Sequence, residues 1–144
     1  MLHNDDAGAI RHIADLALAA REARDRAFLN AAKLELDEPE PPQGRPRPAH
    51  RLGLAALPND EPAARALRDA IDGAPDDLKR KLWVVMRIGS GDYAADEWGQ
   101  AIDDAALLSH SAFLSELADE AELHTRLMKG LYELRIAEQT NKAL

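Results

Sequence analysis

The chain has 144 residues, a formal net charge of −8 and no cysteine; its length favours one domain, and the lack of cysteine excludes disulfides, thiolate metal ligands and cysteine nucleophiles. The negative charge opposes binding to nucleic acid, no apolar run approaches the length of a membrane span, and the N-terminus lacks the basic region of a signal peptide, so we expect a cytoplasmic protein without nucleic-acid or membrane partners. Valine stands only at positions 84 and 85 and threonine only at 125 and 140, and this scarcity of β-branched residues predicts an all-α fold.

Residues 1–36 are predicted to form an N-terminal helix. One face of this helix carries apolar side chains at helical spacing, namely Ile10, Ile13, Ala17 and Ala20. Acidic residues stand near its start, where the helix dipole favours negative charge. The small alanine side chains on the apolar face would let a neighbouring helix approach closely.

Residues 37–60 are predicted to be a proline-rich linker between this helix and a helical core at 61–144, all within a single domain 1–144. Prolines favour extended, polyproline-like backbone, and they stand at positions 39, 41, 42, 46 and 48. Pro39 and Pro42 have the P-x-x-P spacing of ligands for proline-binding domains. Because no basic residue flanks them at the usual place, we interpret the segment as a spacer.

The first helix of the core is predicted to be capped by Asn59 or Asp60 and to end at Gly73. Its inner face is expected to comprise Ala63, Leu67, Ala70 and Ile71.

The stretch from Leu82 to Ala105 is predicted to be a helical hairpin at the centre of a compact bundle of about six helices. Apolar residues recur at helical spacing on both sides of a Gly-Ser-Gly-Asp turn, which are Leu78, Leu82, Val85 and Gly89 before it and Trp98, Ile102 and Ala105 after it. Gly89 has the position of a left-handed helix terminator. Asp92 has the position of a cap for the second helix.

The C-terminal part is predicted to hold a break at Ser109–Ser111, a short helix with Phe113 and Leu117, and a last helix from Glu120 to about Gln139. Asp119 to Glu122 resembles a capping box. The last helix carries two apolar stripes, of which the main one comprises Leu123, Leu127, Leu131 and Leu134 and the second comprises Met128, Tyr132 and Ile136. Such a broad apolar face indicates a helix that is central or shared with another chain, so the second stripe is the candidate oligomer face.

The turn motif Ile88-Gly89-Ser90-Gly91-Asp92-Tyr93, followed by Glu97-Trp98, resembles the W-I-G-R-G-D-Y…E-W signature of an uncharacterised bacterial family. That family is catalogued as domain of unknown function 3775. Ser90 replaces the usual arginine of the signature, and Arg87 stands where a bulky apolar residue is common. The likeness extends over most of the chain with Ala20–Glu22 and Gly130-Leu131, but the family's proline before the last helix is missing. The resemblance implies a small helical protein and supplies no mechanism.

Motifs for catalysis, cofactors and metals do not match. The turn lacks the lysine of a phosphate-binding loop and the oxygen ligands of a calcium loop. The five histidines form no H-x-x-x-H pair, and no nucleophile elbow is present. We therefore predict no catalytic residue, no cofactor and no metal, and we favour a non-catalytic protein.

Aromatic and polar residues around the turn form the one candidate interaction or pocket cluster, which comprises Trp83, Arg87, Asp92, Tyr93 and Trp98. Aromatic residues and arginine are typical anchors of interfaces, but aromatics also lock helical turns by core packing, and we favour core packing for Trp98. The first functional hypothesis is a cytoplasmic protein-interaction module that self-associates, as a dimer, through the last helix or binds another protein. The alternative is a small-molecule binder or enzyme with a pocket near the turn.

Overall fold

The computed structural model describes residues 2–37 and 61–143, and these residues confirm the predicted all-α bundle. They form six α-helices and contain no strand. The helices are α1 (Asn4–Asp37), α2 (Pro62–Asp72), α3 (Asp76–Gly89), α4 (Trp98–Ala105), α5 (His110–Ala118) and α6 (Leu123–Ala143), with a short 3₁₀ turn η2 (Ala95–Glu97) before α4. The predicted linker lies outside the described residues, except for Asp37, which ends α1.

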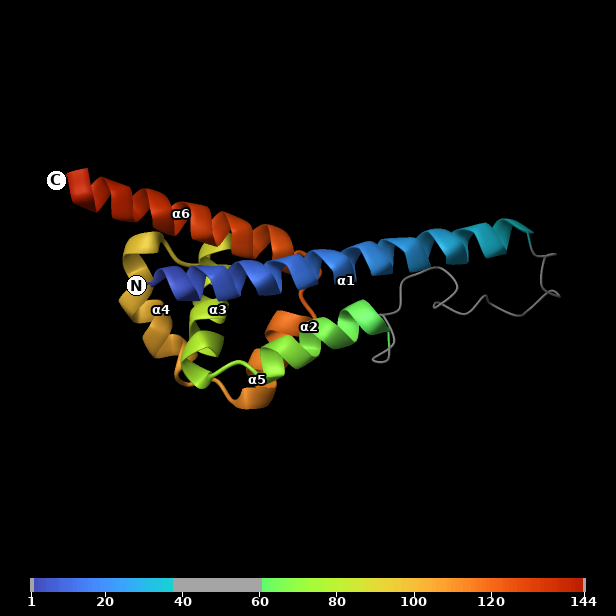
Figure 1. The fold of residues 1–144 in the computed structure, drawn as a ribbon, viewed down its shortest axis with the longest axis horizontal. Helices are drawn as coiled ribbons and strands as arrows, with labels where there is room; N and C mark the ends of the chain where they lie inside the picture. The colour runs from blue at the N-terminus through green and yellow to red at the C-terminus, as the bar shows by residue number, and fades with distance from the viewer. Residues whose placement is uncertain (1, 38–60, 144) are drawn as a thin grey trace.

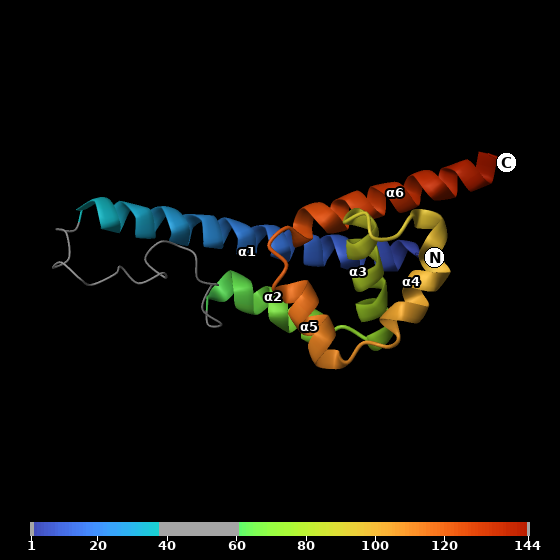
Figure 2. The ribbon, with the colours of Figure 1, turned by 180° about the vertical axis from the view of Figure 1, so that it is seen from behind.

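The two long helices α1 and α6 lie side by side along one side of the molecule, and the shorter helices pack beneath them (Figures 1 and 2). The C-terminal half of α1 projects from one end of the bundle, and the C-terminal half of α6 projects from the other. Helix α2 packs along α1, and α5 packs on α2 and α3. The long helices therefore leave parts of their surfaces outside the bundle.

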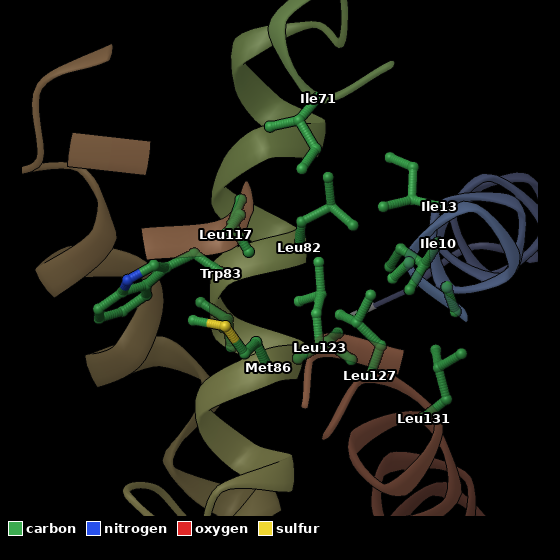
Figure 3. Close-up of a cluster of buried hydrophobic side chains, with 14 of the residues drawn as sticks. Ile10, Ile13, Ile71, Leu82, Trp83, Met86, Leu117, Leu123, Leu127 and Leu131 are labelled. Carbon is green, nitrogen blue, oxygen red and sulfur yellow. The ribbon is translucent and has the colours of Figure 1, made fainter. Parts of the chain in front are cut away.

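Helix α3 is the centre of the bundle because it is buried on nearly all sides. Six large apolar side chains of its C-terminal half are buried, namely Leu82, Trp83, Val84, Val85, Met86 and Ile88. They meet Ile10 and Ile13 of α1, Ile71 of α2, Leu117 of α5 and the main leucine stripe of α6 (Figure 3). The C-terminal half of α3 is apolar on almost every side, and such a segment belongs in a core. The predicted central hairpin is thus α3, the turn and α4, and the most extensive packing of α3 is with α6.

Two glycines allow the backbones of α3 and α6 to come into close contact where the helices cross. A Cβ added to Gly89 would lie 1.8 Å from the carbonyl oxygen of Arg126, and one added to Gly130 would lie 2.1 Å from the carbonyl oxygen of Val85. Gly89 was predicted as a left-handed terminator, and this is wrong. It is the last residue of α3, and Gly91 is the residue with positive φ, at 86°. Gly89 is needed because no side chain fits between the two helices.

Several predicted helix ends are also corrected. Glu61 caps α2 by accepting a hydrogen bond from the backbone N–H of Ala64, in place of Asn59 or Asp60. Asp92 does not cap the helix after the turn, because η2 intervenes and Asp92 pairs with Arg87. Ser109, where a break between helices was predicted, is the N-cap of α5, because its hydroxyl accepts a hydrogen bond from the backbone N–H of Ala112.

The last helix also begins later than predicted. Helix α6 starts at Leu123, and no capping box forms at Asp119, whose carboxylate pairs with Arg68. At the other end of the chain, α1 starts at Asn4, and Asp6 accepts a hydrogen bond from the backbone N–H of His3.

A lysine joins the start of α1 to the first turns of α3. Lys81 Nζ lies 3.0 Å from Asp6 Oδ2 and 2.9 Å from Asp77 Oδ2. The His3 N–H and the Lys81 ammonium both favour the carboxylate form of Asp6 and hold its pKa below the ordinary value. The contact fixes the N-terminus of α1 beside α3.

Candidate functional site

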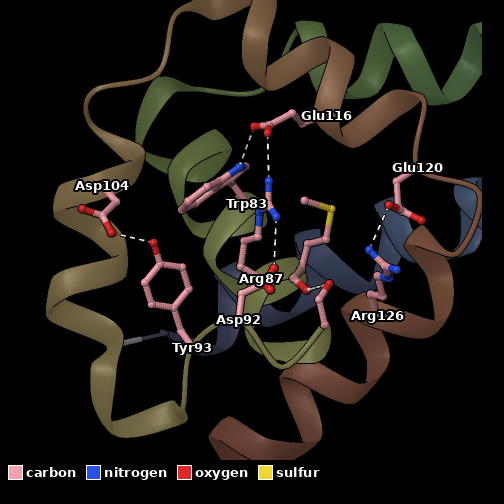
Figure 4. A network of polar contacts seen from close by, with 10 residues as sticks. Trp83, Arg87, Asp92, Tyr93, Asp104, Glu116, Glu120 and Arg126 are labelled. Atoms are coloured by element: carbon pink, nitrogen blue, oxygen red, sulfur yellow. Dashed lines mark hydrogen bonds and ion pairs between the residues drawn. The ribbon is translucent and has the colours of Figure 1, made fainter.

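The predicted cluster around the turn is brought together by a carboxylate from α5. Glu116 accepts a hydrogen bond from Trp83 Nε1 at 2.8 Å and another from Arg87 at 2.8 Å (Figure 4). The Arg87 guanidinium also lies over the Trp83 ring, 5.2 Å from its centroid, which is within the range of a cation–π interaction. Trp83 and Arg87 are one turn apart on α3, so a single carboxylate can reach both.

Arg87 is the most heavily used polar side chain of the cluster. It pairs with Glu116 across the helix interface and with Asp92, at 3.0 Å, across the turn. Burial lowers the pKa of the guanidinium, but the hydrogen bonds and charges of Asp92 and Glu116 outweigh burial and raise it. Arg87 Nε is buried and has no hydrogen-bond partner among the described residues. Both terminal nitrogens are thus committed to partners within this protein.

Tyr93 closes the other side of the cluster. Its ring lies 6.1 Å from that of Trp83, centroid to centroid, with the planes tilted by 59°. Its hydroxyl donates to Asp104 of α4 at 2.5 Å (Figure 4). The Asp104 carboxylate, which accepts this bond and repels a second negative charge, raises the pKa of the phenol. Trp98 is half-buried and packs against the core without joining the polar network.

Replacing Tyr93 with phenylalanine is expected to remove a pH dependence of stability in the alkaline range. The folded protein holds the phenol proton more tightly than the unfolded chain does. The stabilisation is therefore full below the unfolded pKa of about 10 and is lost as pH rises through the folded value. Urea unfolding at several pH values should show a steeper alkaline loss for the wild type than for Tyr93→Phe. Tyr132→Phe is the matched control, and an equal slope in all three proteins would contradict the assignment.

The hollow beside the turn is a shallow surface pocket of about 250 Å³. Its lining includes three carboxylates from the end of α5 and the connection to α6, and each is paired with an arginine: Glu116 with Arg87, Asp119 with Arg68, and Glu120 with Arg126. The polar groups near the turn therefore face one another. This geometry does not favour the pocket hypothesis.

The predicted oligomer face lies on the outer side of α6. Met128, Tyr132 and Ile136 are 40%, 64% and 43% exposed, whereas the main leucine stripe is buried. Next to this face, between the projecting half of α6 and the first turns of α1, is an open groove of about 580 Å³. The lining of the groove is mixed: it includes apolar Leu2, Ala7 and Leu131 and polar Arg11, Arg135 and Glu138, together with Met128 and Tyr132 of the face itself.

A further cluster of polar side chains, away from the turn, was not predicted from the sequence. Lys79 Nζ lies 3.1 Å from His110 Nδ1, and His110 Nε2 lies 2.7 Å from Asp72 Oδ1. The three residues come from α3, α5 and α2. Nothing in the sequence spacing marks them as neighbours.

These features define a class of protein: a helical bundle whose charged side chains near the turn pair with one another and whose last helix exposes an apolar face. Within residues 2–37 and 61–143, no three His, Asp or Glu side chains are grouped so that they could hold a metal ion. None of the helices in that part of the chain is long and apolar enough to cross a membrane. No protein-family model matches the sequence, and comparisons with curated proteins and with solved structures found no similar protein.

Proposed function

We propose that this protein is a non-catalytic interaction module of the cytoplasm that self-associates through the outer face of α6. The observation that carries the proposal is the row of three large apolar side chains, Met128, Tyr132 and Ile136, which remain exposed on one helix. Single exposed apolar residues are common on proteins, but a contiguous row is typical of an interaction site. A relationship to the uncharacterised bacterial family, based on the resemblance of the turn motif, is a separate proposal.

The size of the face sets a requirement on the interface. Met128 and Ile136 are eight residues apart, which corresponds to about 12 Å along the helix axis. A stable dimer buries about 1,200–2,000 Å² in total, which is more than three side chains supply. The rest of the interface would have to come from neighbouring surface of α1 and α6, where the lining of the groove includes Leu2 and Ala7 among polar residues.

A second copy of α6, running antiparallel, fits this face by charge. If Tyr132 faces its symmetry mate, Met128 of one copy faces Ile136 of the other. Lys129 and Glu133 stand on the same side of the apolar row. In this arrangement Lys129 is offset from the partner's Glu133 by two residues, or about 3 Å along the axis. Opposite charges therefore flank the apolar contact.

The double variant Tyr132→Glu with Ile136→Glu is expected to convert a dimer into a monomer. Two carboxylates on the apolar row would have to be desolvated in the interface, which is strongly unfavourable. Sedimentation velocity over a concentration series should give the wild type twice the 15.8 kDa mass of one chain and the variant that mass once. Leu107→Glu is the matched control, because Leu107 is 86% exposed in the connection between α4 and α5, outside α6, and should leave the dimer intact.

The orientation has a separate test, because the chain contains no cysteine. If the helices are antiparallel, the variant carrying Met128→Cys and Ile136→Cys should form two interchain disulfides under mild oxidation. Met128→Cys alone should form none, because the two copies of residue 128 are then about 12 Å apart along the axis; in a parallel pair the single variant would also crosslink. A wild type that stays monomeric at high concentration would refute self-association. A dimer that Tyr132→Glu with Ile136→Glu does not weaken would place the interface elsewhere.

A further inference from the structure

The groove between the first turns of α1 and the projecting half of α6 has the dimensions of a ligand site. Its volume is about 580 Å³, and sites for small molecules ordinarily measure about 300–1,000 Å³. Its lining on α6 extends from Met128 to Gln139, which corresponds to about 16 Å along the helix axis. The groove therefore suits an elongated ligand.

The lining offers such a ligand apolar contacts from both walls. Leu2 and Ala7 come from the start of the chain, and Leu131 comes from α6. Met128 and Tyr132, which are 40% and 64% exposed, belong to the same lining. Burying apolar surface of a ligand against such side chains is favourable in proportion to the area removed from water. An alkyl chain would gain from these contacts, whereas a wholly polar ligand would not.

The charge of the groove is opposite to that of the chain as a whole. The chain carries 26 acidic residues against 18 basic ones, but the lining holds two arginines, Arg11 and Arg135, against one carboxylate, Glu138. Elsewhere on the same two helices, Arg21 and Arg126 pair with carboxylates. Neither arginine of the groove forms an ion pair with a carboxylate of the described residues. The groove therefore presents positive charge that an anionic ligand could neutralise.

The two ends of the groove differ in charge. Helices α1 and α6 lie side by side and run in opposite directions (Figures 1 and 2), and the His124 ring of α6 contacts the carbonyl oxygen of Ala14 of α1 at 2.9 Å. Arg11, one turn before Ala14, therefore lies near the Met128 end of the groove. Glu138 lies about 15 Å further along the axis of α6. An anionic group is attracted at the Arg11 end and repelled at the Glu138 end.

We propose that the groove binds a free amphiphile with one alkyl chain and one anionic head, of which a fatty acid is the simplest example. The Arg11 guanidinium donates hydrogen bonds to the carboxylate, and a guanidinium can donate two in parallel. The alkyl chain lies against Ala7 and Leu131, and Arg135 adds positive charge along the rim. All of these residues belong to one chain, so the proposal goes beyond self-association and does not depend on it.

Isothermal titration calorimetry with dodecanoate, below the concentration at which it forms micelles, tests the proposal. The wild type should bind one molecule per chain. Acetate, which has the head without the alkyl chain, should not bind detectably. Dodecyltrimethylammonium, which has the chain with a cationic head, should bind at least about tenfold more weakly, the factor that one hydrogen bond to a charged group is worth. Equal binding of the two dodecyl compounds, or no binding of dodecanoate, would overturn the proposal.

Variants assign the head and the chain of the ligand to their residues. Arg11→Met, which keeps the apolar stem, should weaken dodecanoate binding about tenfold, and Ala7→Phe, which fills the groove, should abolish it. Arg26→Met is the matched control, because Arg26 is an exposed residue of α1 outside the lining. Unchanged binding in Arg11→Met, or an equal loss in Arg26→Met, would contradict the assignment.

Two further measurements distinguish the groove from the self-association face and from a membrane surface. Ile136 lies outside the lining, so Ile136→Glu should bind dodecanoate as the wild type does, and a loss there would overturn the assignment of the site to one chain. A monomeric wild type that binds dodecanoate would refute self-association and support the groove. Vesicles of anionic phospholipid should not sediment the protein, and sedimentation that depends on Arg11 would overturn the proposal of a free ligand.

Discussion

Alanine at Gly89 is expected to lower the free energy of unfolding by about 3 kcal/mol or more. Overpacking a core ordinarily costs about 1–3 kcal/mol, because side chains rotate away from the added atoms. Here the added Cβ would lie 1.8 Å from the carbonyl oxygen and 2.7 Å from the carbonyl carbon of Arg126, and both belong to the backbone of α6. Relief requires α3 and α6 to move apart over their whole crossing. The effect therefore lies at or above the upper end of the usual range.

Gly130→Ala tests the same crossing from the other helix. Its Cβ would meet the carbonyl oxygen of Val85 at 2.1 Å, and the effect should be of similar size. Because either substitution already separates the helices, the double variant should lose less stability than two independent sites would. Urea unfolding followed by tryptophan fluorescence measures all three.

Gly99→Ala is the control for the glycine substitutions. Gly99 lies in α4 with open space around its Cβ position, so alanine should stabilise the helix by up to about 1 kcal/mol through its higher helix propensity. A loss at Gly89 no larger than about 1 kcal/mol would show that α3 and α6 are not in close backbone contact.

Gly89 also shows why part of the fold could not be predicted from the sequence. A glycine at the end of an apolar helical run is ordinarily a terminator, and the neighbouring Ser90-Gly91 supported that interpretation. The left-handed residue is Gly91. A glycine that permits close helix contact has the same local sequence as one that ends a helix, and the difference lies in Gly130, which is remote in the chain. Periodicity predicted the helices and their inner faces, whereas the pairing of α3 with α6 depends on such remote complements.

The candidate site could also be predicted from the sequence only in part. Trp83, Arg87, Asp92 and Tyr93 were predicted as a group because they are near one another in sequence on a helix and its turn. Their main acceptors, Glu116 and Asp104, come from α5 and α4 and carry no local signal. Carboxylates are abundant in this chain, so composition does not single out these two. For the same reason the Lys79 and His110 contact, 31 residues apart in sequence, could not be predicted.

Glu116→Ala is expected to lower the free energy of unfolding by about 2–3 kcal/mol. Hydrogen bonds to charged groups contribute about 1.5–3 kcal/mol, and a donor that is left without an acceptor destabilises the protein further. The substitution deprives Trp83 Nε1 and one Arg87 nitrogen of their acceptor at the same time. Water can reach part of Arg87, which limits the loss on that side. Trp83 is buried, so we expect its N–H to account for most of the effect.

The charge and the acceptors of Glu116 can be separated by comparison with Glu116→Gln. Glutamine keeps one oxygen, which can accept from Trp83 or Arg87, and turns an NH₂ group toward the other donor. It should therefore lose a large part of the stability that alanine loses. Asp69→Ala is the matched control, because it removes an ion pair with Arg65 in which both side chains are largely exposed, and such pairs contribute about 0–1 kcal/mol. If Glu116→Ala lost no more stability than Asp69→Ala, Glu116 would be an ordinary surface residue. The turn would then be held by the Arg87 and Asp92 pair and by aromatic packing alone.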